Sequence, residues 1–490
     1  MSAGYARKLV KAAYLCYTEE KCAGISIIPT DGGETVNGLR FFLALAVGKC
    51  AQLAMRLLGK KATYLPGKLA LRICPDFLSR IGKPALLIGV TGTNGKTTVS
   101  NMLCDLLIGF GEDPVSNRLG SNIDAGAASS LLEAASLSGR CKRRVGVLEM
   151  DERSAARIFP ATKPDYLVIT NLFRDSMRRN AHPEYIASLL DKYIPPETRL
   201  ILNRDDPISS NVAKLNSRVY FGIDPLPFEP PVRENLVVDA RLCPICGEPI
   251  QYDFRRYNHI GRAHCDSCGW TSPQSDFQLI SADREAGLMT VLENDVWHDY
   301  RMPSDAVYNL YNAVAAVAAL RTVGYSPEQI AEGMQKLEVV QSRFWQEQIG
   351  SWELTEIMAK GLNAVACSRN FDYVANAEGK KAVVLLLDDV FDEKSSSENI
   401  AWLYDADFEF LAEDDTVQVL AVGARCLDTR LRLLIAGVPA ERITVVRQAK
   451  DAAAAVNLPQ CTKVFVLYEV YRQNQAVMVR NAIAERMRKA

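Results

Sequence analysis

The sequence predicts an α/β protein in which a parallel sheet carries a phosphate-binding loop, followed by a second, smaller α/β domain. A glycine-rich loop at 92–98 follows the apolar run 85–90 and precedes the apolar-periodic segment 99–108. Short apolar strands then alternate with segments of helical spacing, as in the βαβ units of a parallel sheet. These strands are 145–148, 166–169 and 200–202. The same rhythm returns toward the C-terminus, with strands at 382–387, 417–422, 443–446 and 464–467.

Length and composition limit the class of protein. A chain of 490 residues is too long for one hydrophobic core, so two or three domains are expected. The 57 lysines and arginines balance 58 acidic residues, which gives no electrostatic argument for nucleic acid or an anionic membrane surface. No apolar run reaches the roughly 20 residues of a spanning helix, and a signal-peptide core is missing. The thirteen cysteines, mostly single, fit a reducing compartment. We therefore expect a cytoplasmic protein with no transmembrane segment and no nucleic-acid partner.

The loop has the residue types that a phosphate site needs. Glycines let backbone N–H groups approach phosphate oxygens, and the helix that follows adds positive potential at its N-terminus. A lysine reaches the β- and γ-phosphates of ATP, and the hydroxyl after it holds Mg²⁺. The strict pattern has a glycine where this chain has Val90, and Gly89 stands one residue early, so a solvated turn is the alternative. Lys96 is expected to be an exposed side chain. The candidate ATP-binding residues are Gly92, Thr93, Asn94, Gly95, Lys96, Thr97 and Thr98.

A carboxylate ends the next predicted strand. Glu149 follows the apolar stretch 145–148, and a carboxylate beside the loop can hold Mg²⁺ together with Thr97. The alternative is a carboxylate that favours a helix N-terminus. Asp151 and Glu152 are expected to act as caps or to support the site.

Four cysteines have the spacing of a zinc ribbon. Two C-x-x-C pairs are separated by 18 residues, and four thiolates complete a tetrahedral, structural site. Four unrelated thiols or a redox pair are the alternatives, and His264 is expected to be a surface residue. The candidate zinc ligands are Cys243, Cys246, Cys265 and Cys268.

The chain is expected to have three parts. Residues 1–38 form an N-terminal extension, and 39–340 form the ATP-binding domain with the zinc ribbon inserted at 240–270. Residues 341–490 form the smaller α/β domain. Two motifs near the boundary add candidate nucleotide-binding residues. Asn309 and Asn312 begin a helix of small residues and have the donors and acceptors to read an adenine edge, with helix capping as the alternative. Arg343 is positioned to approach phosphate or ribose, or is a surface charge.

Taken together, these elements resemble the Mur ligase superfamily. The loop, the strand-end Glu149, the Asn309-x-x-Asn312-x-x-Ala-Ala motif and Arg343 occur in that order. The chain is more closely similar to the MurT family within it. The shared features are Tyr-Leu-Pro-Gly at 64–67, Thr-Asn-Leu-Phe-Arg-Asp at 170–175, the four-cysteine insertion and Trp-Leu-Tyr-Asp-Ala-Asp-Phe-Glu at 402–409. The resemblance covers about residues 39–490.

The resemblance implies a Mur ligase-type domain and a synthetase subunit that works as a heterodimer with a class I glutaminase subunit. The implied reaction is ATP-dependent amidation of the α-carboxylate of D-Glu in the stem peptide of lipid II at the membrane surface. ATP, Mg²⁺ and structural Zn²⁺ are the implied cofactors. Lys96 would neutralise γ-phosphate charge, and Thr97 and Glu149 would hold Mg²⁺ while the carboxylate becomes an acyl phosphate. Ammonia from the partner would then displace phosphate.

The family also implies a group that orients the partner's catalytic histidine. Family members have an aspartate three residues before the tryptophan that matches Trp402, and this chain has Asn399 there. An asparagine serves in this role in Cys–His–Asn sites. Glu398 stands beside it, and Asp392 is a displaced candidate because the loop 388–402 is longer than usual, so all three stay open. The sequence at 176–182 also departs from the family pattern, which concerns the substrate side.

Two other functions compete with this interpretation. The first is another Mur-type amino-acid ligase, which would need no glutaminase; the four cysteines and the segment 402–409 argue against it. The second is a divergent partner that binds ATP and scaffolds a complex without catalysis. The intact loop argues against the scaffold, whereas Asn399 and Arg178 allow it.

Overall fold

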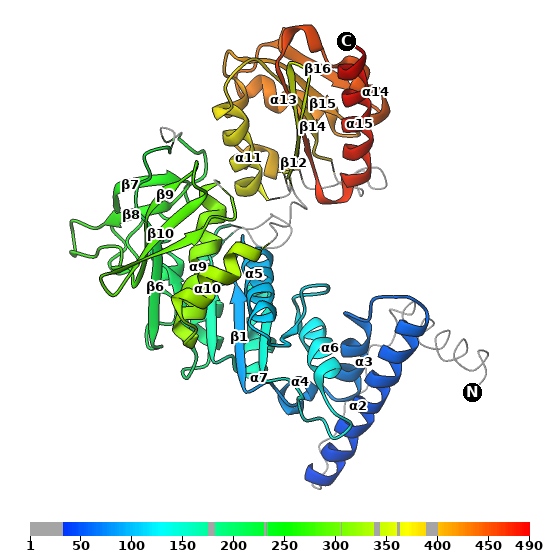
Figure 1. Cartoon of the computed structure of the whole chain (residues 1–490), viewed down its shortest axis with the longest axis vertical. Helices are drawn as coiled ribbons and strands as arrows, with labels where there is room; N and C mark the ends of the chain where they lie inside the picture. Colours follow the sequence, from blue (N-terminus) through cyan, green and yellow to red (C-terminus); the bar gives the residue numbers. More distant parts are fainter. Residues whose placement is uncertain are drawn as a thin grey trace.

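The computed structural model describes residues 33–174, 182–229, 232, 234–304, 306–337, 344–359, 363–388 and 400–490. These residues form two α/β units, drawn one above the other in Figure 1. We call the described residues up to 337 the middle domain and those from 344 onward the C-terminal domain. Most of the predicted extension 1–38 and four of the candidate residues lie outside the described residues. These four are Arg343, Asp392, Glu398 and Asn399.

The middle domain is built on a nine-stranded sheet in the order β11-β10-β9-β6-β5-β4-β1-β3-β2. The strands from β2 to β9 in this order run parallel, and β10 and β11 add an antiparallel edge. The predicted parallel sheet is therefore confirmed. The strands are β1 (Leu86–Thr91), β2 (Val115–Ser116), β3 (Val145–Glu149), β4 (Tyr166–Ile169), β5 (Arg199–Asn203), β6 (Arg218–Ile223), β9 (Phe277–Asp283), β10 (Leu288–Glu293) and β11 (Val296–Arg301).

Helices cover both faces of this sheet because its central strands are apolar on both sides. Ile88 and Val90 of β1 pack into the core under α5, α9 and α10, whereas Leu87 packs into the core on the opposite face. Helix α9 is buried over most of its surface, which its run of alanines and valines makes possible. The helices are α5 (Lys96–Gly109), α6 (Asp124–Ala134), α7 (Ala155–Thr162), α8 (Pro183–Tyr193), α9 (Val307–Val323) and α10 (Pro327–Lys336), with 3₁₀ turns η1 (Glu152–Ser154) and η2 (Ser209–Asn211).

Three helices precede β1 and pack beside α6 at the β2 edge of the sheet. They are α2 (Gly33–Leu57), α3 (Leu65–Ile73) and α4 (Phe77–Arg80). Within α2, the stretch Gly38–Leu57 has a mean hydropathy of 1.3. By length and composition alone, this stretch is long and apolar enough to cross a membrane. Only 28% of that stretch is buried in the protein. Helical apolar spacing was expected from residue 39 onward, but not an apolar stretch of this length, because Gly48, Lys49 and Cys50 follow the apolar run 41–47.

The four-cysteine insertion lies beside a two-stranded hairpin of β7 (Gln251–Tyr257) and β8 (Ile260–His264). Arg256 fastens this hairpin to the sheet and to α9. It donates to the Tyr311 hydroxyl (2.7 Å) and to the Ile223 carbonyl (2.9 Å). Tyr311 in turn donates to Asp205, 2.6 Å away and fully buried.

The C-terminal domain has a six-stranded sheet in the order β12-β13-β17-β14-β15-β16, parallel except for β12. One apolar core packs under α11, α12 and α13 and another under α14 and α15, so this unit also has three layers, as Figure 1 shows. The strands are β12 (Phe344–Ile349), β13 (Trp352–Met358), β14 (Lys381–Leu386), β15 (Thr416–Val422), β16 (Ile443–Val446) and β17 (Lys463–Tyr468). The helices are α11 (Ala364–Asn376), α12 (Trp402–Asp405), α13 (Cys426–Ile435), α14 (Ala449–Ala455) and α15 (Gln473–Lys489), with 3₁₀ turns η3 (Phe408–Leu411), η4 (Ala440–Arg442), η5 (Leu458–Gln460) and η6 (Val470–Arg472).

A buried carboxylate joins the two domains. Asp407 is 1% exposed and accepts hydrogen bonds from Asn235 Nδ2 (2.8 Å) and from the Leu236 N–H (2.6 Å) of the middle domain. Its own N–H donates to Ser368 Oγ of α11 (2.9 Å). Burial raises the pKa of Asp407 above its usual range, although these donors oppose the shift. The segment 402–409, which the sequence analysis singled out, therefore forms part of the contact between the domains.

An arginine of the C-terminal domain adds a second contact. Arg369 of α11 lies over the rings of Tyr257 (4.7 Å), Tyr308 (5.5 Å) and Phe173 (5.9 Å), measured from the guanidinium carbon to the ring centroids. All three rings belong to the middle domain. A guanidinium above aromatic faces is attracted by their negative potential and keeps its charge partly solvated. Together with the ion pair of Asp405 and Arg174 at 3.8 Å, these interactions hold the domains in the arrangement of Figure 1.

We expect Asp407→Ala to lower the free energy of unfolding by about 1–3 kcal/mol, because it leaves the donors of Asn235 and Leu236 without their buried acceptor. The matched control is Asp414→Ala, whose carboxylate is fully exposed and pairs with Arg442 of the same domain at 3.1 Å. An exposed pair of this kind is worth about 0–1 kcal/mol. Calorimetric melting of both variants checks the difference. Equal losses would mean that Asp407 does not hold the interface.

Candidate functional site

The loop between β1 and α5 closes at two glycines. Gly92 and Gly95 have positive φ angles of 122° and 87°. A Cβ atom at Gly92 would clash with Thr170 Oγ1, and one at Gly95 would clash with Asn312 Oδ1, so neither position accepts a side chain. Helix α5 begins at Lys96 and no side chain caps it. Its first N–H groups therefore lack intrahelical partners and form a position that favours an anion.

The residues after β4 hold the loop from the side. Thr170 Oγ1 donates to the Asn94 carbonyl (2.6 Å), and Asn171 Nδ2 donates to the same oxygen (3.1 Å). The Asn171 side chain also accepts from the Asn94 N–H (3.0 Å), and its carbonyl accepts from the Thr93 N–H (2.8 Å). Thr93 Oγ1 accepts from the Phe173 N–H (2.9 Å). Because β1 and β4 are neighbours, the motif that follows β4 shapes the loop.

Lys96 forms a buried ion pair with Glu152. Its Nζ lies 3.0 Å from Glu152 Oε2 and also donates to the Gly92 carbonyl. The side chains are 12% and 3% exposed, so the expectation of an exposed lysine is wrong. Burial acts to lower the pKa of Lys96, but the carboxylates of Glu152, Glu149 and Asp151 outweigh it and raise the pKa. The lysine is therefore held charged at the N-terminus of α5.

Glu149 lies at the end of β3, opposite Val90 of β1 and one residue from the end of that strand. Asn117 holds its backbone with two hydrogen bonds of 2.8 Å, one to the carbonyl and one from the N–H. Asn122 Nδ2 donates to the Glu149 carboxylate (3.1 Å). The sequence analysis missed both asparagines, which follow the two-residue strand β2 and have no recognisable motif. Among the described residues no other hydrogen bond to the Glu149 carboxylate is present, so its second oxygen is open to a cation.

Helix α9 brings a second element to the loop. Asn312 is 7% exposed, and its side-chain oxygen lies against Gly95. Asn309 is partly buried one turn earlier. Neither residue caps α9, which begins after Ala306 without a side-chain cap, so the helix-capping alternative is wrong.

Several buried polar atoms around the loop have no hydrogen-bond partner among the described residues. They are Thr91 Oγ1, Asn94 Nδ2, Ser100 Oγ and Asn101 Oδ1. Buried polar groups normally find partners, so orphaned ones beside a glycine loop indicate room for a polar ligand. The open N–H groups, the positions that exclude a Cβ atom and these atoms together fit a bound phosphate with its cation.

The four cysteines converge within 4.8 Å of one another. The Sγ atoms of Cys243 and Cys268 are 3.6 Å apart, and those of Cys246 and Cys265 are 3.5 Å apart. Thiolates at 2.3 Å from a tetrahedral zinc ion would be about 3.8 Å apart, so the cluster fits such a metal. Burial opposes the Cys243 thiolate, but N–H groups of the turn donate to it and lower its pKa to about 7. His264 lies beside two aspartates and is not part of the cluster.

Asp388 precedes the segment that is predicted to face the partner, and hydrogen bonds hold it in place. Asp388 follows β14, and its carboxylate accepts from Arg472 Nη2 (2.8 Å) and from the Ala424 N–H (3.1 Å). Arg472 also donates to the Asp388 carbonyl (3.0 Å). The candidates Asp392, Glu398 and Asn399 follow this anchor and lie outside the described residues.

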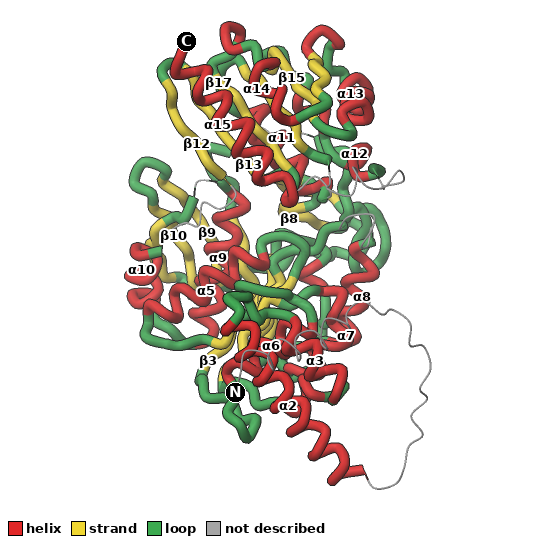
Figure 2. Tube along the Cα trace, turned by 90° about the vertical axis from the view of Figure 1, so that its right-hand side faces the viewer, coloured by secondary structure: helices red, strands yellow, loops and turns green. Residues whose placement is uncertain are grey.

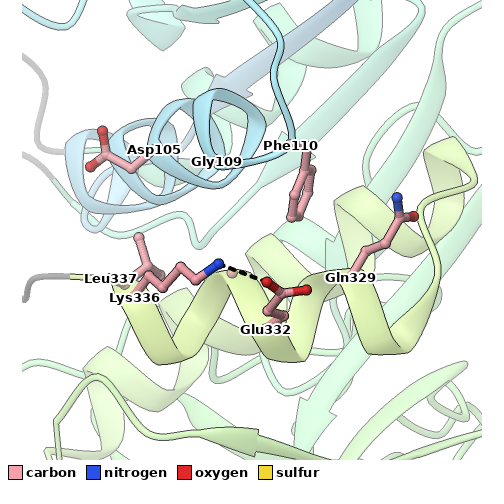
Figure 3. Close-up of a pocket in the computed structure, with 8 residues that line it drawn as sticks. Asp105, Gly109, Phe110, Gln329, Glu332, Lys336 and Leu337 are labelled. Atoms are coloured by element: carbon pink, nitrogen blue, oxygen red, sulfur yellow. Dashed lines mark hydrogen bonds and ion pairs between the residues drawn. The ribbon is translucent and has the colours of Figure 1, made fainter.

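A pocket between α5 and α10 lies away from the loop. Figure 3 shows it lined by Asp105, Phe110 and the ion pair of Lys336 with Glu332. Its lining comes from the C-terminal end of α5 and from α10, and includes no residue of the loop. It is therefore not the phosphate site.

Comparison with known proteins gives the family. Residues 90–224 match the model of the Mur ligase middle domain, and 361–471 match that of the MurT ligase C-terminal domain. The chain is 30% identical over 403 residues to a Staphylococcus aureus (strain COL) protein named lipid II isoglutaminyl synthase (glutamine-hydrolyzing) subunit MurT, covering 82% of this chain and 89% of that protein. A Streptococcus pneumoniae (strain ATCC BAA-255 / R6) protein of the same name is 29% identical, covering 88% and 94%. A pseudomurein peptide ligase type C from Methanothermus fervidus has the same fold, with a TM-score of 0.60, 20% identity and coverage of 84% and 80%.

The chain has the architecture of a Mur ligase-type protein, with a parallel sheet, a loop at the end of β1 and a separate C-terminal α/β unit. The relatives extend along most of the chain, and the C-terminal domain has its own matching model. The chain belongs to the MurT family of ligase subunits.

Proposed function

We propose that this chain is the ATP-dependent synthetase subunit of a glutamine-dependent amidotransferase in peptidoglycan biosynthesis. The substrate is the α-carboxylate of D-Glu in the stem peptide of lipid II, which is converted to the amide in the cytoplasm. One observation carries the proposal: Lys96 is held charged at the open N-terminus of α5, between Glu149 and Glu152, in a member of the MurT family. The named relatives are subunits of a glutamine-hydrolysing lipid II isoglutaminyl synthase.

The loop residues have separate roles in this proposal. ATP with Mg²⁺ supplies a transferable phosphoryl group. Gly92, Gly95 and the first N–H groups of α5 bind the phosphate chain, and Lys96 neutralises the charge on its end. Thr97 and Glu149 hold Mg²⁺, with Asn122 orienting the carboxylate. Phosphoryl transfer is mostly positioning and charge stabilisation, so the first step needs no base from the protein. Thr93, Asn94 and Thr98 complete the loop, and Asn309, Asn312 and Arg343 complete the nucleotide site.

The chemistry balances in two steps. A carboxylate oxygen of D-Glu attacks the γ-phosphorus, the bond to the β-phosphate oxygen breaks, and an acyl phosphate forms. Ammonia then adds to the acyl carbon and phosphate leaves, which forms the amide after loss of a proton. A class I glutaminase subunit supplies the ammonia as the partner in a heterodimer. Asn399, Glu398 or Asp392 of this chain orients the histidine of that partner.

We assign a structural role to the cysteine cluster. Four thiolates occupy every position of a tetrahedral zinc ion and leave none for a substrate. The cluster is held by its hairpin against Asp205 and α9, so zinc would stabilise this side of the middle domain. Zinc would contribute folding energy locally and take no part in the reaction.

The experiments that test this function also distinguish it from two other functions. Another Mur-type amino-acid ligase would not need a glutaminase, and the match of 361–471 to the MurT C-terminal model argues against it. A non-catalytic scaffold would bind ATP without amidating lipid II.

We expect Lys96→Ala to slow amidation by at least about a hundredfold, because the charge that stabilises the transferring phosphoryl group is lost. The assay is mass spectrometry of lipid II after incubation with ATP, glutamine, this chain and its glutaminase. Lys96→Ala alone leaves Glu152 buried without a counterion, so Lys96→Ala with Glu152→Gln serves as the stable form of the variant. The control is Lys336→Ala, an exposed lysine of α10. Wild-type rates in the stable double variant would rule out this loop as the reaction site.

We expect the chain, purified under reductant, to hold one zinc ion, measured by elemental analysis. Cys265→Ser should release the zinc and expose 240–270 to protease without abolishing nucleotide binding, since the cluster is separate from the loop. Cys50→Ser is the control, because Cys50 is exposed and outside the cluster. Absence of zinc from the wild-type chain would refute the assignment.

We expect one of three single alanine substitutions, at Asn399, Glu398 or Asp392, to reduce glutamine hydrolysis in the complex by roughly a hundredfold or more. A catalytic histidine needs a third group to fix its tautomer and direction. Asp414→Ala is the control, because Asp414 is a fully exposed acid of the same domain. Loss at Asn399 alone would assign the role to the aligned position.

The readout should be kcat for glutamine, with ATP binding by this chain measured in parallel. Unchanged hydrolysis in all three variants would mean that the glutaminase orients its own histidine. The shared site would then be wrong, whereas the assignment of the loop would stand.

A further inference from the structure

Helix α2 has two apolar faces. One is buried: Phe41, Ala44 and Leu45 pack toward α3 and α6, and the Phe41 ring stacks on Phe77 with centroids 5.4 Å apart. Gly48 lies against Leu132 of α6 on the same side. This face fixes α2 to the protein.

The opposite face of α2 is apolar and exposed. Its residues follow one another at spacings of four and three, which places them in one stripe along the helix. Leu39, Leu53 and Leu57 are 73%, 60% and 76% exposed. A helix that is apolar on all sides is normally buried, so a stripe of this length in solvent requires an explanation. The stripe, called the outer face of α2, consists of Leu39, Leu43, Ala46, Cys50, Leu53 and Leu57, with Phe42 beside it.

The surroundings of the outer face are strongly basic. Residues 38–83 contain nine lysines and arginines and a single acidic residue, Asp76, in a chain whose net charge is −1. Arg40 borders the outer face near its start, and Lys60 and Lys61 follow its end; all three are exposed. Balanced overall charge therefore conceals a positive N-terminal region, which the composition of the whole chain does not reveal.

The charges around the outer face and the packing of α2 indicate what kind of surface binds there. A second copy of the chain would bring the same cations together, which opposes pairing through the outer face. A membrane-spanning arrangement would strip the buried face of α2 from α3 and α6. An amphipathic helix that is fixed on one side and apolar on the other, with basic residues around it, matches the surface of an anionic bilayer. Figures 1 and 2 show α2 at the margin of the molecule, where such a surface has access.

We propose that the outer face of α2 docks the protein on anionic phospholipid membranes. Leu39, Leu43, Leu53 and Leu57 enter the boundary between headgroups and acyl chains, while the cations of Arg40, Lys60 and Lys61 contact lipid phosphates. The helix lies along the surface and does not cross it, because its other face stays on α3 and α6. This docking surface is separate from the loop and needs neither ATP nor a partner.

The test is flotation of the full-length chain with vesicles of phosphatidylcholine, with or without phosphatidylglycerol, in the absence of nucleotide and substrate. The wild-type chain should float with the anionic vesicles and be released by salt. Leu43→Glu with Leu53→Glu should weaken this partitioning by at least about tenfold. Replacing Arg40, Lys60 and Lys61 by glutamine should weaken it by about fivefold for each cation removed.

The matched control is Leu215→Glu with Leu288→Glu, two exposed leucines outside α2, which should float like the wild type. All variants change exposed side chains, so their melting temperatures should match the wild type and confirm folding. Failure of the wild type to float with anionic vesicles, equal flotation with neutral vesicles, or wild-type flotation of the Leu43, Leu53 variant would each overturn the proposal. A dimer in light scattering that this variant disperses, without vesicle binding, would overturn it in favour of a second copy.

These outcomes do not depend on the proposed reaction. With lipid II dissolved in detergent, the Leu43, Leu53 variant should amidate at the wild-type rate, because the outer face is not part of the loop. A chain that floats but does not amidate would contradict the proposed function alone, and one that amidates but does not float would contradict the membrane surface alone.

Discussion

The position of β4 beside β1 is the constraint on which the rest of the site depends. The loop after β1 has little structure of its own, and its carbonyl and N–H groups are taken up by Thr170 and Asn171. With the loop held in this way, the N-terminus of α5 stays open and Lys96 is directed inward. β3 on the other side of β1 adds Glu149. The parallel sheet thus brings to one edge three groups that are far apart in the chain, as expected for ligand sites in such sheets.

The contact between the two domains also involves the residues that follow β4. Asp407 and Arg369 both reach the middle domain from the C-terminal domain, one by hydrogen bonds to backbone and amide, the other by its position over aromatic rings. The rings include Phe173, whose N–H also bonds to the phosphate loop. The loop and the C-terminal domain therefore contact the same short stretch after β4. Motion of one domain against the other would change the support of the loop.

The sequence predicted the strands and the glycine loop because both depend on local patterns. The apolar runs at 145–148 and 166–169 and the spacing of Gly92, Gly95 and Lys96 need no knowledge of the fold. It did not predict that Asn117 and Asn171 hold the neighbouring strand and loop, or that Glu152 pairs with Lys96, because these contacts depend on which strands become neighbours. Lys96 was expected to be exposed for the same reason. The exposed side of α2 was missed because a helical apolar pattern does not reveal which of two apolar faces packs inward.

The burial of the Glu152 carboxylate beside Lys96 bears on which anions can bind at the loop. This carboxylate is the counterion of Lys96, and it is 3% exposed. An anion that takes over Lys96 would leave a buried negative charge behind, and an uncompensated charge of this kind costs several kcal/mol. The incoming anion must therefore bring a cation or a proton with it. If the loop binds ATP as proposed, a bare phosphate ion would meet an electrostatic penalty there that a metal-complexed polyphosphate avoids, and accompanying charge as well as shape would decide which anion binds.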